Sequence, residues 1–148
     1  MLEQKKGSSN EIGYSSGGPS TKIHAVVDSY GYPLYLMISE GQRSDMKYSI
    51  PVLQPVALRG TTVLADRGYN DQTLMESIRN QGGNFIIPSK SNSKKQRNCD
   101  WWHYKERHVV ENFFLKLKSY RRIATRYDKL ACTYLGFLCL ASILIWLK

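Results

Sequence analysis

A run of 17 residues near the C-terminus, from Ala131 to Leu147, contains no charged side chain. Apolar side chains gain free energy on leaving water, so this segment is expected to be buried in a folded core or in a membrane. Its length is at the lower limit of the membrane-spanning range, and its Thr, Ser, Gly and Cys residues reduce its apolar content. We therefore expect a buried helix that packs on a sheet, with a membrane anchor as the alternative.

The length of the chain limits the number of domains. Its 148 residues are enough for one domain with a hydrophobic core but not for two of ordinary size. The first 20 residues are polar, lack periodicity and contain no apolar segment typical of secretory signals. We predict a flexible lead-in at residues 1–20 and a folded domain at residues 21–148. The three cysteines are too widely spaced for a zinc site or a disulfide framework, which is typical of a reducing cytoplasm.

The expected elements downstream of Thr21 follow a mixed α/β order. Two runs of β-branched and aromatic residues flank a turn that contains Gly31, which predicts a hairpin. A helix, a strand, a second helix, another strand and two further helices are expected after it. The expected ranges are 21–28 and 33–41 for the hairpin, 44–56, 70–83, 102–120 and 131–147 for the helices, and 61–66 and 84–90 for the later strands. No internal repeat is visible, so the pattern predicts one α/β unit.

The positive charge is concentrated in one part of the chain. The formal net charge is +9, and residues 90–129 hold 12 Lys and Arg against 4 Asp and Glu, so +8 of it lies there. A basic block attracts a phosphate backbone because each neutralised phosphate releases condensed counterions. The block includes a polar loop at residues 91–100 that we expect to be mobile or to face nucleic acid. An ordinary solvated surface is the alternative.

Four side chains in the expected helix at 102–120 share one face. They are Tyr104, Arg107, Glu111 and Lys118, separated by three, four and seven residues, and they fall within an arc of about 60°. A neighbouring apolar stripe can pack on the core. A carboxylate flanked by basic side chains suits a site that handles divalent cations and DNA phosphate. The alternative is a surface helix in which Glu111 only pairs with Arg107, one turn earlier.

Asp66 is a second candidate for this chemistry. It ends the apolar segment VLAD and precedes Gly68, at the edge where open α/β sheets bind their ligands. Its alternative role is to cap the turn or the following helix. Asp66 and Glu111 together could converge on Mg²⁺ or Mn²⁺ ions that activate a water and stabilise the leaving oxygen of a phosphodiester. Two carboxylates rarely complete such a site, and the only upstream Asp on an expected strand is Asp28.

The four-residue helix pattern resembles the signature of a known family. The DDE transposases of bacterial insertion sequences, in the families numbered four and five, carry Tyr, Arg, Glu and Lys at these spacings in one helix. The segments SGGPSTKIHAVVD, VLADRGYN and YKERHVVENFFLKLKSYRRIATRYDKL, with the apolar tail, also look like the catalytic core of that family. The resemblance covers the chain from about Gly17 onward.

The resemblance implies a ribonuclease H-like fold, which is a mixed sheet with flanking helices, and a metal-dependent DNA transposase. By this resemblance, Asp66 and Glu111 are the second and third catalytic carboxylates and the ligands of Mg²⁺ or Mn²⁺. The side chains expected to bind DNA are Tyr104, Arg107, Lys118, Arg121 and Arg122.

The first catalytic aspartate of the family has no match upstream of Thr21. We therefore expect a core that is truncated at its N-terminus and lacks the first strand. We interpret Asp28 as structural, with its side chain bonded to the backbone of its own turn, and replacement of the missing aspartate is its alternative role. Members of the family are often made from two overlapping reading frames, so the upstream-frame product or a full-length transposase is an expected partner.

Three functions remain open at this point. The first is a partial catalytic core that cleaves transposon ends and joins them to target DNA, as a homodimer on double-stranded DNA at the nucleoid in the cytoplasm. The second is a catalytically inactive fragment that binds DNA or inhibits the transposase. The third, a membrane-associated basic protein, explains neither Asp66 nor the helix signature, so no membrane partner is expected. One of the tryptophans Trp101 and Trp102 is expected in the core.

Overall fold

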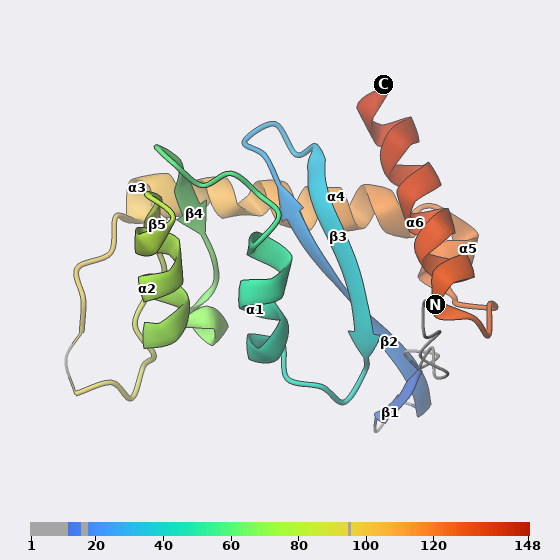
Figure 1. The fold of residues 1–148 in the computed structure, drawn as a ribbon, viewed down its shortest axis with the longest axis horizontal. Helices are drawn as coiled ribbons and strands as arrows, with labels where there is room; N and C mark the ends of the chain where they lie inside the picture. Colours follow the sequence, from blue (N-terminus) through green and yellow to red (C-terminus); the bar gives the residue numbers. More distant parts are fainter. Residues whose placement is uncertain (1–11, 16–17, 95) are drawn as a thin grey trace, which may run out of the picture.

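A computed structural model describes residues 12–15, 18–94 and 96–148, and its strands form two small sheets (Figure 1). The first sheet is antiparallel, with the order β1 (Gly13–Ser15), β2 (Gly18–Val27) and β3 (Pro33–Glu40). The second pairs β4 (Thr62–Leu64) in parallel with β5 (Asn84–Ile86). The mixed α/β class is confirmed, whereas the strands of the described residues do not join into one sheet.

The hairpin of β2 and β3 matches the expected one, and its turn is closed by Asp28. Asp28 Oδ1 accepts hydrogen bonds from the backbone N–H groups of Tyr30 and Tyr32, both at 2.9 Å. Gly31 has φ +88°, a conformation that side chains with a Cβ rarely adopt. The prediction that Asp28 bonds its own turn is therefore confirmed.

The sheet begins earlier than the expected domain boundary. β1 and the first three residues of β2 lie before Thr21, inside the expected lead-in. They pair in register, with Gly13 opposite Ser20, and this pairing needs no apolar periodicity. That is why the polar, Gly- and Ser-rich sequence gave no sign of a strand. The expected flexibility of residues 1–11 and 16–17 concerns positions outside the described residues.

Helix α1 (Met46–Leu53) and helix α2 (Gln72–Asn80) cover one side of the molecule. Asp71 caps α2, with its side chain accepting a hydrogen bond from Leu74 N at 3.2 Å. Asp45 precedes α1 but makes no capping bond, because its carboxylate forms an ion pair with Lys22 at 3.0 Å. Both helices are short and are held by apolar packing.

The expected helix at 102–120 is interrupted by one turn of 3₁₀ helix. It consists of α3 (Trp101–Tyr104), η2 (Lys105–Arg107) and α4 (His108–Lys118). His108 Nδ1 lies 2.8 Å from the Lys105 carbonyl oxygen, so this side chain competes for a backbone acceptor at the break. Trp101 and Trp102 are both mostly exposed, so the expectation that one of them is in the core was wrong.

Two apolar cores lie on opposite faces of the β2–β3 hairpin. Residues alternate between them along β2, as the two-residue repeat of a strand requires: Ile23, Ala25 and Val27 face one core and Val26 the other. The first core is completed by α4, α5 (Arg121–Ala124) and α6 (Ala131–Trp146). The second contains residues of α1, α2, β4 and β5. Figure 1 shows α1 and α4 on opposite sides of the hairpin.

Helix α6 packs on β3, α4 and α5, as expected for a helix that covers a sheet. No helix in the described part of the chain is long and apolar enough to cross a membrane. Only one side of α6 is buried, through Tyr134, Leu138, Ala141 and Ile145. Its outward side remains apolar and exposed.

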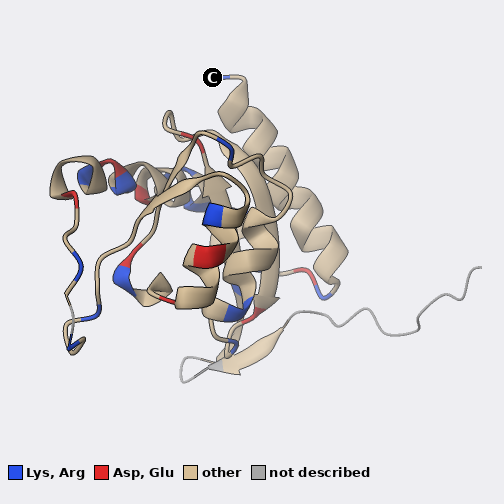
Figure 2. Ribbon diagram, turned by 60° about the vertical axis from the view of Figure 1, so that its left-hand side comes forward, with Lys and Arg blue, Asp and Glu red and all other residues tan. Residues whose placement is uncertain are grey.

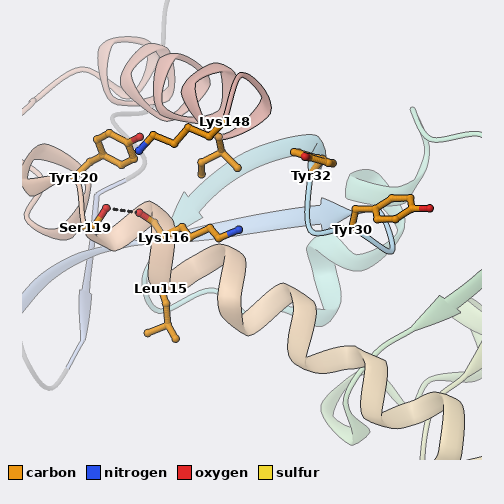
Figure 3. Close-up of a pocket in the computed structure, with 8 residues that line it drawn as sticks. Tyr30, Tyr32, Leu115, Lys116, Ser119, Tyr120 and Lys148 are labelled. Atoms are coloured by element: carbon orange, nitrogen blue, oxygen red, sulfur yellow. Dashed lines mark hydrogen bonds between the residues drawn. The ribbon is translucent and has the colours of Figure 1, made fainter.

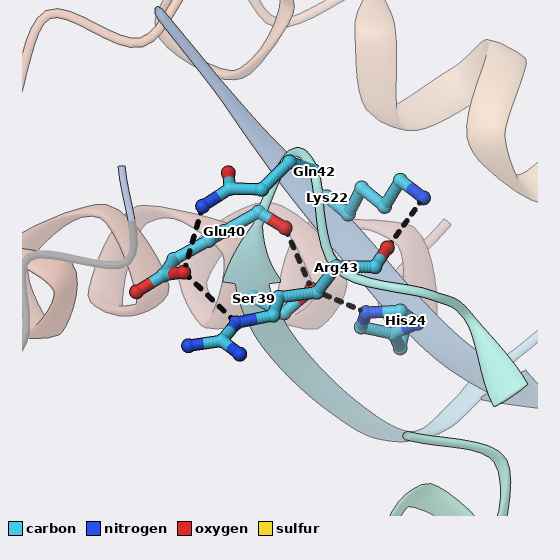
Figure 4. A network of polar contacts seen from close by, with 6 residues as sticks. All are labelled: Lys22, His24, Ser39, Glu40, Gln42 and Arg43. Atoms are coloured by element: carbon cyan, nitrogen blue, oxygen red, sulfur yellow. Dashed lines mark hydrogen bonds and ion pairs between the residues drawn. The ribbon is translucent and has the colours of Figure 1, made fainter. Parts of the chain in front are cut away.

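A buried polar pair, which the sequence did not indicate, links the two hairpin strands. His24 Nε2 lies 2.8 Å from Ser39 Oγ, and the His24 ring stacks on Tyr48 of α1 with 4.7 Å between ring centroids. Figure 4 shows the pair beside a second cluster, in which Glu40 binds Arg43. Burial is the main cause of a lowered pKa for His24, which the nearby Asp45 opposes and Lys22 reinforces. His24 is therefore held in its neutral form.

Candidate active site

Asp66 lies in an exposed turn just beyond β4, separated from the strand by Ala65. Its Oδ1 accepts a hydrogen bond from Gly68 N at 2.7 Å and caps the 3₁₀ turn Arg67–Tyr69. A Cβ at position 68 would lie 2.8 Å from that same oxygen, closer than real contacts allow. Gly68 therefore permits the observed position of the Asp66 carboxylate. The capping role that was the alternative for Asp66 is present.

Tyr69 is the last residue of this 3₁₀ turn, and its pKa depends on the charges around it. Burial, together with the negative charges of Asp45 and Asp66, raises the pKa of Tyr69 to about 12. The Tyr69 hydroxyl thus stays protonated at neutral pH. The same observation shows that Asp45, before α1, and Asp66, after β4, both lie near Tyr69.

Glu111 and Arg107 form an ion pair across one turn of the expected helix. Arg107 Nη2 lies 2.5 Å from Glu111 Oε1, and the Glu111 side chain is 57% exposed. The Arg107 guanidinium carbon lies 5.7 Å from the centre of the Tyr104 ring. Three of the four predicted side chains are therefore adjacent despite the 3₁₀ turn between them. The pairing is also the one expected if Glu111 had only a surface role.

Arg107 binds Glu111, and the charge of Asp66 has a smaller influence on it. Burial by itself lowers the pKa of Arg107, but the hydrogen bond with Glu111 and the charges of Tyr104, Glu111 and Asp66 outweigh it, so the pKa is raised. The negative charge of Asp66 thus acts on the same guanidinium that binds Glu111. Among the described residues, however, no ion pair joins Arg107 to Asp66, so this influence acts at longer range than the pairing with Glu111.

The other predicted DNA-binding residues lie farther along the chain, in different surroundings. Lys118 is exposed at the last residue of α4. Arg121 is exposed at the start of α5. Arg122 lies over the ring of Phe137 in α6, 4.3 Å from its centre, and 3.9 Å from Asp128. Arg122 therefore also contributes to the attachment of α6.

The polar loop at residues 91–100 has no regular element among its described residues, as expected. One of its cations, Arg97, is exposed but contacts side chains on or near α2. Arg97 binds Asn70 Oδ1 at 2.6 Å and Met75 Sδ at 2.8 Å, both on or near α2. These contacts hold this part of the loop against α2.

The candidate site offers carboxylate oxygens, which a hard divalent cation such as Mg²⁺ prefers as ligands. Mg²⁺ typically binds one or two carboxylates and completes its coordination shell with water and phosphate. Asp66 and Glu111 are exposed carboxylates, and the ion pair with Arg107 engages only one oxygen of Glu111. Within the described residues, no group of three or more His, Cys, Asp or Glu could hold a metal ion. The site offers two carboxylates and one competing cation.

A groove that the sequence did not reveal runs beside α4. A cavity of about 610 Å³ lies between the hairpin tip, α4 and the end of α6, and Figure 3 shows Lys116 and Lys148 beside three tyrosines there. A second hollow of about 440 Å³ shares Tyr30, Leu115 and Lys116 with it. No acidic residue lines either one. Leu115 is one helical turn beyond Glu111, so the groove begins next to the candidate site.

This groove depends on the hairpin tip resting on α4, which no local pattern encodes. A Cβ at Gly31 would lie 3.2 Å from Val109 Cγ1, so the small residue allows the close approach. The aromatic residues of the tip, Tyr30 and Tyr32, were visible in the sequence only as turn residues.

Comparisons with known proteins agree with the resemblance stated above. Two family models, each described as a transposase DDE domain, match residues 3–101 and 63–148. A protein named as a transposase for insertion sequence element IS6501 from Brucella ovis is 38% identical over 131 residues, which cover 87% of this chain and 99% of that protein. A protein named as a transposase for insertion sequence element IS402 from Burkholderia cepacia is 28% identical over 86% of this chain and 63% of its own length. No solved structure matches the chain.

Proposed function

Because the chain belongs to the DDE transposases of insertion sequences, we propose that it acts in cutting and joining DNA and supplies Asp66 and Glu111 as catalytic carboxylates. The supporting observation is that Arg107 interacts electrostatically with both carboxylates. We infer from it that the VLADRGY segment and the helix signature contribute to one site.

When DNA is present, Arg107 can bind either Glu111 or a backbone phosphate. In the free protein it neutralises Glu111. A backbone phosphate can accept two parallel hydrogen bonds from a guanidinium, so it competes well with one carboxylate oxygen. DNA binding turns Arg107 toward the phosphate and frees Glu111 beside the bond to be cut. Tyr104, next to the guanidinium, limits where that phosphate can lie.

Asp66 and Glu111 would hold Mg²⁺ or Mn²⁺, whose preference for oxygen ligands their carboxylates match. Such an ion, when bound, supplies activation of water and stabilisation of the leaving oxygen. Gly68 donates its N–H to Asp66 and so orients this carboxylate. Tyr69 remains a neutral neighbour and adds no further negative charge at neutral pH.

Double-stranded DNA is the proposed partner, and the surface for it extends from the site along α4. Lys118, Arg121 and Arg122 continue the positive charge beyond Glu111. The groove beside Leu115 combines lysines with tyrosines, which bind phosphates and stack on bases, respectively. A DNA strand that leaves the duplex at the site would follow this groove.

The proposed fold is ribonuclease H-like, within a single catalytic domain that spans residues 21–148 together with the strands at 13–20. Its support is the element order, in which a hairpin, α1, β4, α2, β5 and α4 follow one another. In this proposal Asp66, two residues beyond β4, and Glu111, on α4, are the carboxylates that the family resemblance implies. Because its proposed partner is DNA, the chain is proposed to act at the nucleoid.

A catalytically inactive fragment that binds DNA or inhibits the transposase is the alternative function. It is favoured by one observation: the described residues contain no group of three metal-binding side chains. Asp28, the upstream aspartate, uses Oδ1 to hold its hairpin turn, which argues against a third catalytic role for it. In this alternative, Arg107 and the groove lysines bind DNA and Glu111 serves only the ion pair.

The experiment compares the chain with its Glu111→Gln and Asp66→Asn variants. Strand cleavage is measured with Mg²⁺ or Mn²⁺ on a labelled duplex that carries the terminal repeat flanking the gene, and DNA binding is measured by mobility shift. The same proteins are also added to the upstream-frame product. Arg59→Gln is the matched control, because Arg59 precedes β4 and so lies at the opposite end of the strand from Asp66.

Cleavage that both carboxylate substitutions abolish while DNA binding persists would support the catalytic proposal, whether the chain acts alone or with the upstream product. DNA binding without cleavage under either condition would support the inactive fragment. Cleavage unchanged in both variants would overturn the assignment of Asp66 and Glu111.

A further inference from the structure

A histidine and an aspartate at the start of α3 form a pair that the candidate site does not use. His103 Nδ1 lies 2.6 Å from Asp100 Oδ2, and the His103 side chain is 66% exposed. The hydrogen bond with His103 is the main cause of a lowered pKa for the Asp100 carboxyl, so Asp100 is ionised at neutral pH. An ionised carboxylate can only accept, so Nδ1 of His103 donates in this bond. No hydrogen bond joins Nε2 of His103 to another residue of the described chain.

Helix capping explains only half of this arrangement. Asp100 Oδ1 accepts hydrogen bonds from the backbone N–H groups of Trp102 and His103, both at 3.1 Å, as an N-cap residue does. The cap needs no bond to Oδ2. That second oxygen holds the imidazole ring in one orientation, as carboxylates do for histidines that bind metals or substrates. Because Asp100 uses both oxygens and occupies these N–H groups, the ring nitrogen Nε2 is the group of this pair that can bind a partner.

The surface around the pair is basic. Residues 94–107 hold five Lys and Arg against two Asp and Glu, a formal charge of +3. Figure 2 shows Lys and Arg along the loop before α3 and on the helical segment after it. Arg107, which is proposed to bind a DNA phosphate, follows His103 by four residues, about one helical turn. A DNA backbone held by Arg107 therefore has neighbouring phosphates close to His103.

The two tryptophans of α3 favour a nucleic acid as the partner. Trp101 and Trp102 are 55% and 77% exposed, although burial would stabilise both rings. Lys105 Nζ lies 5.6 Å from the centre of the Trp102 ring. Exposed aromatic rings beside cations are typical of surfaces that bind nucleic acids, where the rings stack on bases and the cations bind phosphates.

We propose that protonated His103 binds a DNA phosphate through Nε2, so that the affinity for DNA depends on pH. This inference rests on the proposed function, because it takes DNA as the partner. A histidine gains its second ring proton near neutral pH, and the protonated ring carries a positive charge and donates from Nε2. The negative charge of Asp100 stabilises that form and its bond to Nδ1 fixes the ring. The affinity is therefore highest in slightly acidic solution and falls as the pH rises.

The other titratable groups around α3 keep their charge state between about pH 6 and 8. They lie in the loop before α3, in α3 itself and in η2, which contacts it: Cys99, Asp100, Tyr104, Lys105, Glu106 and Arg107. Burial and the charge of Asp100 raise the pKa of the Cys99 thiol, so it stays uncharged. Lysines, arginines and carboxylates ordinarily keep their charge throughout this range. A change of DNA affinity in this range is thus the property that identifies a histidine.

The test measures DNA affinity of the full chain by fluorescence anisotropy between about pH 6 and 8, at constant salt and without divalent metal. The affinity should fall about tenfold as the pH rises, which corresponds to the loss of one hydrogen bond to a charged group. His103→Gln should bind weakly at every pH. His103→Lys, whose charge persists over the whole range, should bind tightly at every pH. A histidine with only a structural role would not be replaced by lysine in this way.

Two further variants serve as controls, and thermal melting checks that each variant folds. His108→Gln should keep the pH dependence, because His108 is an exposed histidine whose Nδ1 already lies 2.8 Å from the Lys105 carbonyl oxygen. Asp100→Asn should keep the cap, since Asn is also a preferred N-cap residue, but it removes the negative charge. Its affinity should therefore begin to fall at a lower pH than that of the original chain.

The outcomes separate this inference from the proposed function. DNA binding that does not change with pH, or whose pH dependence survives in His103→Gln or disappears in His108→Gln, would overturn the role of His103 and leave the proposed function intact. An Asp100→Asn chain that follows the original chain at every pH would overturn the role of Asp100. Absence of DNA binding at every pH would overturn the proposed function together with this inference.

Discussion

At the scale of single residues, Arg107 determines how the candidate site behaves without DNA. Its guanidinium binds one oxygen of Glu111 and is also influenced by Asp66. This cation compensates the charge of Glu111 directly and is influenced by Asp66 only at longer range, without an ion pair. The same cation repels a divalent metal ion that approaches them. Arg107 is therefore expected to weaken metal binding in the free protein and to favour phosphate binding in the complex.

Replacement of Arg107 by Gln should change these two properties in opposite directions. Mn²⁺ binding to the free protein, measured by isothermal titration with MnCl₂, should become tighter because a competing positive charge is removed. DNA cleavage should fall by about tenfold or more, since a hydrogen bond to a charged group contributes about 1.5–3 kcal/mol. Arg59→Gln removes the same charge from the other end of β4 and should change neither property. Weaker Mn²⁺ binding in Arg107→Gln would contradict this role.

His24 makes the stability of the hairpin depend on pH. Burial lowers its pKa below the 6.5 of the unfolded chain, despite the opposing Asp45. Between the lowered pKa and 6.5 the unfolded state binds more protons, so stability is complete above pH 6.5 and declines as the pH falls below it. His24→Gln, which can still bond Ser39, should flatten this decline. Urea unfolding at several pH values between about 5 and 8 measures the effect.

The control for that measurement is His108→Gln, because His108 is exposed on α4. It should retain the acid-dependent loss of stability of the original chain. If His24→Gln retains it as well, the acid sensitivity arises from other groups and the neutral state of His24 has no influence on stability.

At the scale of elements, α2 was predicted to within three residues at each end, because its signals are local. The helix begins after the Asp71 cap and ends at Asn80, two residues before Gly82, whose φ is +76°. Its apolar residues Leu74, Met75 and Ile78 are all buried. The 3₁₀ turn before α4 was not predicted, since it arises from a side chain bonding the backbone and not from apolar spacing.

The Asp71 cap gives a prediction for the stability of this element. Asp71→Ala removes the hydrogen bond to Leu74 N and should lower the free energy of unfolding by about 1 kcal/mol. Thr73→Ala, at an exposed position of the same helix, is the control and should cost less than half of that. Urea unfolding at pH 7.5 measures both. An Asp71→Ala variant as stable as the original chain would show that packing of α2 suffices without the cap.

At the scale of the whole molecule, the candidate site and the groove depend on contacts between distant segments. The residue types of Asp66, Arg107 and Glu111 predicted a site for metal ions and phosphate. The influence of Asp66 on Arg107, in contrast, depends on the fold. The groove needs the tip of the hairpin, α4 and the C-terminal residue Lys148 together, and none of these contacts has a sequence signal. The split into two sheets likewise depends on which strand edges meet. Local chemistry was therefore predictable, whereas surfaces shared by several elements were not.

The groove makes a prediction about how DNA affinity depends on salt. Each phosphate neutralised by a lysine adds about 0.9 to the steepness of a plot of log affinity against log salt concentration. Lys116, which lines both hollows, should contribute one such phosphate contact. Lys116→Ala should therefore weaken binding at low salt and reduce the slope by about 0.9. Arg59→Gln removes the same charge away from the groove and should leave the slope unchanged. The measurement is fluorescence anisotropy with a labelled duplex that ends in a single strand. If the original chain and Lys116→Ala give equal slopes, DNA does not enter the groove.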